Sequence, residues 1–284
     1  MIAVRVIAAF TLRESLRRRV FAVVGLLTVS FLALYGLGTW QLFRGVDDFA
    51  DAVPGVEPEI VAGATLLGLA MFATLFLGTV LAVFLTLGAV RGDADSGLLQ
   101  PLLVRPLSRR TLLLGRFVAA AGVCGAYVSV VFLAAAVITW ALGGWWPDHV
   151  LAPVLALVLG VAIVAALSLA GSVFLASTAN GIAIFMVFGA GLVAGLLGQI
   201  GEALASETLD TVAKVTSWLL PFEGLYQGAL SALTSDTIGF TRLAIDLGPF
   251  GGAEPGGLWL WLWAVAYLAL VGVVAVRGFA ARDL

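Results

Sequence analysis

The feature that most limits how this chain can fold is its set of long apolar segments without a charged side chain. The longest of them, residues 60–90, contains no Asp, Glu, Lys, Arg or His. About 20 such residues are enough for an α-helix to cross roughly 30 Å of hydrocarbon. The chain is 62% hydrophobic and only 11% charged, whereas soluble domains carry about 25% charged residues. The sequence therefore predicts an all-α polytopic membrane protein with six transmembrane helices, at residues 20–40, 60–90, 117–146, 151–175, 181–200 and 258–276.

The distribution of basic residues predicts how these helices are oriented, because cytoplasmic loops are enriched in Lys and Arg. All but three of the 15 basic residues lie in segments 1–19, 91–116 and 277–284. The exceptions are Arg44, Lys214 and Arg242. Both termini and residues 91–116 are therefore predicted to be cytoplasmic, and residues 201–257 form the largest external segment.

The external segment 201–257 contains a second apolar patch, residues 215–233, which could be a seventh span. Pro221 and Glu223 lie in the middle of this patch. Proline removes a backbone hydrogen-bond donor, and a charge inside the bilayer is costly. We expect instead a helical hairpin that re-enters the outer leaflet or packs on the bundle. An amphipathic helix lying on the membrane surface is the alternative.

The sequence also excludes several kinds of chemistry. A single lysine, Lys214 in "VAKV", rules out a G-x-x-x-x-G-K-[ST] loop, and neither H-E-x-x-H nor G-x-S-x-G is present. Cys124 and His149 are the only residues of their kinds, so no metal site and no bound cofactor is predicted. The uncharged spans disfavour an ion-coupled carrier, a channel or an intramembrane enzyme. An apolar pathway favours lipid-like or amphipathic cargo, although no substrate-binding residue is predicted.

The densest polar segment, "VRGDADSGLLQPLLVRPLSRRTLLLGR" at residues 90–116, lies between two of the predicted spans. Arg105 precedes Pro106 and is therefore disfavoured in a helix, and Ser108 suits the N-cap of the helix that follows. The segment between the glycine-rich start and Arg105 is predicted to form a short helix. Exposed apolar residues on such a helix indicate contact with a partner protein. These residues are Leu98, Leu99, Leu102 and Leu103.

The same segment resembles the cytoplasmic loop of ABC-2 type transporter permeases, in which an acid-x-Gly-Thr, leucines, Pro-x-Ser-Arg and Gly-Lys follow one another. The matching positions are Asp95, Gly97, Pro106, Ser108, Arg109, Gly115 and Arg116. The departures are Asp95 in place of Glu, Leu98 in place of Thr and Arg116 in place of Lys. The tail "RGFAARDL" also resembles the usual end of these permeases. The branch that the chain resembles includes the permease for copper-enzyme maturation in nitrous oxide reduction.

This resemblance implies a type V exporter-like permease fold, with an N-terminal elbow helix at residues 1–19 and an external re-entrant hairpin within residues 201–257. The loop 91–116 would be a coupling helix that docks into a separate ATPase subunit. Two ATPase copies would bind ATP and magnesium, and a second permease chain, identical or not, would complete the pathway. The expected location is the cytoplasmic membrane of a prokaryote, without a nucleic-acid partner. The residues implied in coupling are Asp95, Gly97, Leu98, Leu99, Leu102, Leu103, Arg105, Pro106, Ser108 and Arg109.

The main functional hypothesis is thus an exporter permease that is not itself an enzyme. A membrane anchor or assembly factor that recruits a cytoplasmic protein without moving cargo would use the same leucines and arginines. A second site follows from "GAGLVAG", in which Gly191 and Gly195 have G-x-x-x-G spacing and allow close helix approach. These glycines are predicted to serve either a dimer interface or packing within one chain.

Overall fold

The computed structural model of the chain describes residues 19–45, 56–87, 109–204, 206–246 and 256–281. The described residues are almost entirely helical and contain no strand. The helices are α2 (Arg19–Arg44), α4 (Pro58–Thr86), α6 (Arg109–Gly143), α7 (Leu151–Phe174), α8 (Ser177–Ala203), α9 (Glu207–Leu219), α10 (Pro221–Ala232), α11 (Gly239–Asp246) and α12 (Leu258–Ala280).

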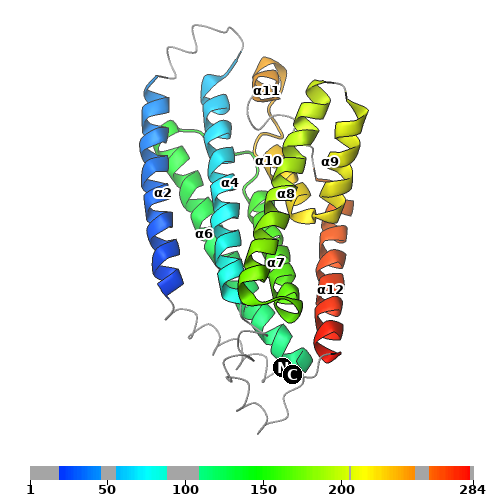
Figure 1. The fold of residues 1–284 in the computed structure, drawn as a ribbon. Coiled ribbons are helices and arrows are strands. Elements are labelled where there is room, and N and C mark those ends of the chain that lie inside the picture. The colour runs from blue at the N-terminus through cyan, green and yellow to red at the C-terminus, as the bar shows by residue number, and fades with distance from the viewer. Residues whose placement is uncertain (1–18, 46–55, 88–108, 205, 247–255, 282–284) are drawn as a thin grey trace.

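Six of these helices are long and apolar enough to cross a membrane, namely α2, α4, α6, α7, α8 and α12. They form an elongated bundle whose long axis follows the helices (Figure 1). In α4 and α7, 67% of the most apolar window is buried within the chain, whereas in α2 and α12 only 11% is buried. The first pair therefore forms the core, and the second pair exposes its side chains to the surroundings. The predicted all-α polytopic fold with six spans is confirmed.

Several helix bounds differ from the predicted spans, and the two largest differences at the starts of helices are those of α6 and α8. α6 begins at Arg109, well before residue 117, so the third span extends beyond the apolar run at its basic end. α8 begins at Ser177 rather than at residue 181, which shortens the polar turn after α7. Asn180 makes this possible, because its side-chain Nδ2 donates a hydrogen bond to the Ser168 carbonyl at 2.9 Å and is itself buried.

Small residues allow the core helices to approach one another. A Cβ atom at Gly78 of α4 would lie 2.4 Å from a Val128 methyl of α6 and 3.0 Å from a Val161 methyl of α7. Around this point Phe132 and Leu157 are fully buried. At the end of α6, Gly144 has φ +69°, a left-handed conformation that ends helices and that glycine adopts without strain.

The two ends of the bundle differ in composition. The starts of α2 and α6 and the end of α12 lie at one end (Figure 1) and carry the basic residues Arg19, Arg109, Arg110, Arg116 and Arg277. Seven of the eight tryptophans lie near the opposite ends of the spanning helices or in the connections there, and Trp218 lies in the last turn of α9. Tryptophan is enriched at membrane–water interfaces, and positive charge marks the cytoplasmic side. The basic residues at the starts of α2 and α6 and at the end of α12 thus lie together, as the predicted orientation requires, and the orientation itself stays a prediction.

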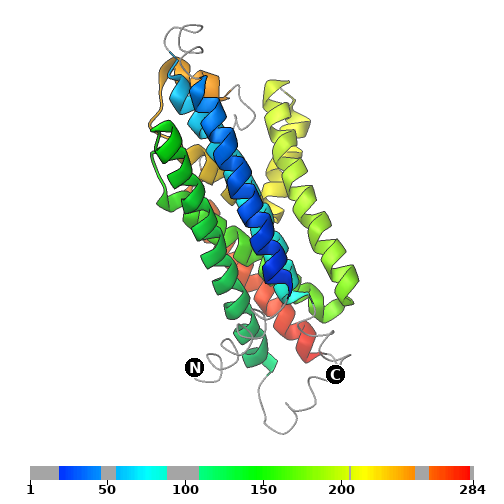
Figure 2. The ribbon, with the colours of Figure 1, turned by 90° about the vertical axis from the view of Figure 1, so that its left-hand side faces the viewer.

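The segment after α8 folds back on the bundle as the helices α9, α10 and α11. α9 packs beside α8, and the two lie together on the side of the bundle away from α6 (Figure 2). Leu220, with φ −126° and ψ 72°, interrupts the helix, and Pro221 then opens α10 at a position where its missing N–H is not needed. α10 packs against α7 and has a buried first turn. The apolar patch at residues 215–233 is therefore a broken helical hairpin within the bundle.

Candidate functional site

The residues predicted to contact an ATPase lie mostly outside the described part of the chain. Arg109 is the exception, since it is the first residue of α6. The coupling role of the loop therefore stays a prediction, as does the elbow helix at residues 1–19. The predicted coupling residues outside the described ranges are Asp95, Gly97, Leu98, Leu99, Leu102, Leu103, Arg105, Pro106 and Ser108.

The structure does describe the two helices that this loop joins, and they pack against each other. α4 ends at Thr86, and α6 begins at Arg109. Both α4 and α6 contact α7 as well. A force applied to the loop would therefore act directly on the helices that form the core of the bundle.

The first turns of α6 are fixed in a separate apolar cluster at the basic end. Leu113 is buried there among side chains of α7 and α12, which include Val173 and Phe279. Close packing continues at Gly278, where a Cβ atom would lie 2.2 Å from the Phe174 ring. The first turns of α6 thus pack tightly against α7 and α12. Because tightly packed side chains are hardly compressible, a displacement of α6 at this end would move the neighbouring helices with it.

Gly191 and Gly195 lie on the face of α8 that receives α10 of the same chain. A Cβ atom at Gly191 would be 2.7 Å from the Phe222 ring, and one at Gly195 would be 2.2 Å from Glu223 Oε1. The Phe222 ring also stacks on Phe188 of α8 with centroids 5.5 Å apart. The close approach that the glycine spacing predicts is therefore used within this chain, and a role in pairing two chains stays a prediction.

The seam between α8 and α10 encloses a polar cluster that the sequence did not single out as a site. Glu223 is only 3% exposed, and its Oε1 accepts a hydrogen bond from Gln227 Nε2 at 3.0 Å. Burial raises the pKa of the Glu223 carboxyl above 4.5, although the hydrogen bond from Gln227 opposes this shift. Gln227 Oε1 and the Tyr226 hydroxyl are buried without a hydrogen-bond partner. The sequence signal was a Glu and a Gln four residues apart in an apolar patch, opposite two glycines with the same spacing.

No metal site is formed by the part of the chain that the structure describes, since it contains no group of three or more His, Cys, Asp and Glu side chains. The free thiol of Cys124 is buried in the core. The described residues thus provide packed helices, a buried carboxyl cluster and the hairpin of α9 and α10.

Comparison with known proteins identifies a family over almost the whole chain. The family model described as "ABC-2 family transporter protein" matches residues 5–284. No curated protein is significantly similar to the chain.

Proposed function

Because this chain belongs to the ABC-2 family of transporter proteins, it is a membrane-embedded permease of an ATP-binding cassette transporter, and we propose that it is an exporter driven through the loop 91–116. In this family the permease is not an enzyme, and ATP is hydrolysed on a separate ATPase subunit. The finer proposal concerns direction, the contact with the ATPase and the assembly. We place two ATPase copies with ATP and magnesium beneath two permease chains, in the cytoplasmic membrane of a prokaryote.

The observation that carries this proposal is the attachment of the loop to the core helices. The loop connects α4 with α6, and the base of α6 packs on α7 and α12. ATP-driven closure of the ATPases would move the loop, and the packed base would pass that movement to the spanning helices as rigid bodies. A loop attached to peripheral helices such as α2 would lack this connection.

The cargo proposed is lipid-like or amphipathic. The long helices carry their charged residues only near their ends, so a pathway between them would be lined by apolar groups and hydroxyls. Such a lining lowers the free-energy cost of moving an apolar molecule, and it offers no charged group to replace the water around a hydrated ion. The resemblance to the branch that serves nitrous oxide reduction stays a prediction, and no cargo is taken from it.

The coupling contact is tested by Leu99→Asp and Leu102→Asp in the chain purified with its ATPase. A charge in place of each leucine should release the ATPase and abolish ATP-dependent transport of a fluorescent lipid in vesicles. Gln100→Asp is the matched control, because it adds the same charge to the same loop and keeps the leucines. Retention of the complex and of transport in both leucine variants would contradict the coupling role. A wild-type complex that binds the ATPase but moves no cargo would instead favour the membrane-anchor function.

A further inference from the structure

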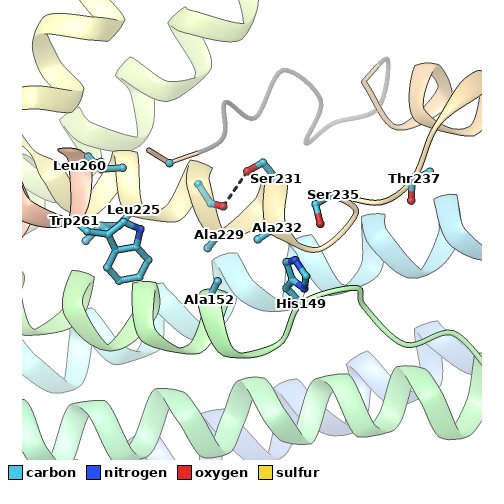
Figure 3. Close-up of a pocket in the computed structure, with 12 residues that line it drawn as sticks. His149, Ala152, Leu225, Ala229, Ser231, Ala232, Ser235, Thr237, Leu260 and Trp261 are labelled. Carbon is cyan, nitrogen blue, oxygen red and sulfur yellow. Dashed lines mark hydrogen bonds between the residues drawn. The ribbon is translucent and has the colours of Figure 1, made fainter. Parts of the chain in front are cut away.

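A cavity of about 400 Å³ lies where α10 passes between the first turn of α7 and the start of α12. Cavities of roughly 300–1,000 Å³ hold small molecules in proteins. Three segments that are far apart in the sequence form this cavity (Figure 3). It lies near the tryptophan-rich ends of the helices, away from the predicted ATPase contact. Nothing in the family membership assigns a ligand to it.

The walls of the cavity are held in place by backbone contacts and by one hydrogen bond to a side chain. A Cβ atom at Gly228 of α10 would lie 2.9 Å from the Gly256 Cα that precedes α12. The Asp148 N–H donates to the Leu233 carbonyl at 3.1 Å, and the Asp236 N–H donates to Asp148 Oδ2 at 2.9 Å. The cavity is therefore formed before a ligand arrives, which lowers the entropy cost of binding.

The cavity has an apolar end and a polar end. Leu225, Leu260 and Trp261 lie toward α12, whereas Ser235, Thr237 and His149 lie toward the connection after α10 (Figure 3). Leu225 is almost fully buried, while His149 and Ser235 are exposed. This arrangement fits an elongated amphipathic molecule whose head group stays near water.

The polar end offers hydrogen-bond acceptors. His149 Nδ1 lies 2.9 Å from the Asp148 carbonyl oxygen, which can only accept, so Nδ1 carries the proton in this contact. In the neutral ring Nε2 is then an acceptor. Asp148 and Asp236, next in sequence to lining residues, add negative charge, and none of the described lining residues is Lys or Arg. An anionic head group would meet repulsion here, whereas a protonated amine would find acceptors.

We propose that this cavity binds an amphipathic primary amine, with its alkyl chain against Leu225, Leu260 and Trp261 and its ammonium group donating to His149. Nε2 of His149 and the hydroxyl oxygens of Ser235 and Thr237 can accept hydrogen bonds, which favours a primary ammonium over a quaternary one, since the latter has no N–H to donate. The binding site is separate from the coupling loop. Its test therefore does not depend on transport or on the ATPase.

The experiment measures binding of radiolabelled octylamine to the full chain in lipid nanodiscs, with empty nanodiscs subtracted. We expect saturable binding at one molecule per chain. Octyltrimethylammonium and octanoate should bind at least roughly tenfold more weakly. Equal binding of octanoate would overturn the cationic head group, and equal binding of octyltrimethylammonium would overturn hydrogen bonding to His149. Uptake that equals that of empty nanodiscs would overturn the site itself.

Variants locate the binding within the chain. Ala152→Leu and Ala232→Leu fill the cavity from two different helices, and each should weaken octylamine binding at least roughly tenfold. His149→Leu should remove the preference for octylamine over octyltrimethylammonium. Ala141→Leu is the control. Ala141 is exposed near the end of α6 and does not line the cavity. Gel filtration and circular dichroism identify variants that fold. Unchanged binding in both folded cavity variants would overturn the proposal.

Discussion

The seam between α4, α6 and α7 and the seam between α8 and α10 are closed by different kinds of side chain. The first is filled by fully buried apolar groups such as Phe132, Leu157 and Val161. The second also depends on close packing, but it encloses the Glu223 carboxyl and buried polar atoms without partners. Removing a carboxyl group from water is costly unless its hydrogen bonds are all replaced. We therefore expect the α8–α10 seam to separate at lower cost than the core seam.

The largest effect on this comparison of the two seams is expected from Gly78→Val, which adds a side chain to the tightly packed core seam. The added side chain would overlap Val128 and Val161 from two directions, which leaves no flexible group to move aside. We expect a loss of about 3 kcal/mol in the free energy of unfolding, seen as a much lower midpoint of thermal unfolding. Gly122→Val on α6 is the control, because a Cβ atom there has no neighbour within 4 Å. Equal effects of the two variants would contradict the close packing of the core.

Gly195→Ala applies the same challenge to the α8–α10 seam. Its Cβ atom would overlap Glu223 Oε1, the end of a flexible side chain, so partial relief is available. We expect a smaller loss of about 1–2 kcal/mol, measured by thermal unfolding.

Gly189→Ala serves as the control on the same helix, since nothing lies within 4 Å of its Cβ position. It should leave stability unchanged or raise it slightly, because alanine favours helices. If Gly195→Ala were as harmless as Gly189→Ala, α10 would not be seated on α8 as described.

Glu223→Gln tests whether the buried carboxyl of the α8–α10 seam makes the stability of the chain depend on pH. The folded carboxyl has a pKa above its ordinary value of 4.5, chiefly because it is buried. The proton is therefore bound more tightly in the folded chain, and its stabilising effect is complete below pH 4.5 and is lost as the pH rises through the folded pKa. We expect the thermal midpoint of the wild type to fall over this range and that of Glu223→Gln to fall less. Glu59→Gln, which changes an exposed carboxylate, should behave as the wild type.

The smallest expected effect comes from a buried polar side chain on α4 of the core seam. Thr79 Oγ1 of α4 is buried without a hydrogen-bond partner, so Thr79→Val should raise stability by up to about 1 kcal/mol. Thr74→Val on the same helix is the contrast, because it removes the 2.7 Å bond from Thr74 Oγ1 to the Ala70 carbonyl. A loss of stability in Thr79→Val would show that this hydroxyl has a partner.

Much of the fold follows from the sequence, because a helix that crosses a membrane must satisfy its own backbone and reveals itself by length and hydropathy alone. The six spans and the break at Pro221 were predictable on that basis. Which helix packs on a given face could not be predicted. The Gly191–Gly195 spacing indicates that another helix approaches closely, but it does not indicate that this helix is α10. The burial of Glu223 was equally hidden, because a Glu-Gln pair four residues apart is also typical of an exposed helix. The coupling residues from Asp95 to Ser108 stay a prediction from the sequence pattern.

The one-sided distribution of the tryptophans has a spectroscopic consequence. Since seven of the eight lie near the ends opposite the arginine-rich ones and Trp218 contacts Trp263, intrinsic emission from this chain reports the environment in that part of the bundle and not at the arginine-rich ends. Brominated lipids confined to one leaflet would quench this emission from one side only. A change in emission on addition of nucleotide would therefore show that a signal had passed from the predicted ATPase contact to the opposite part of the bundle.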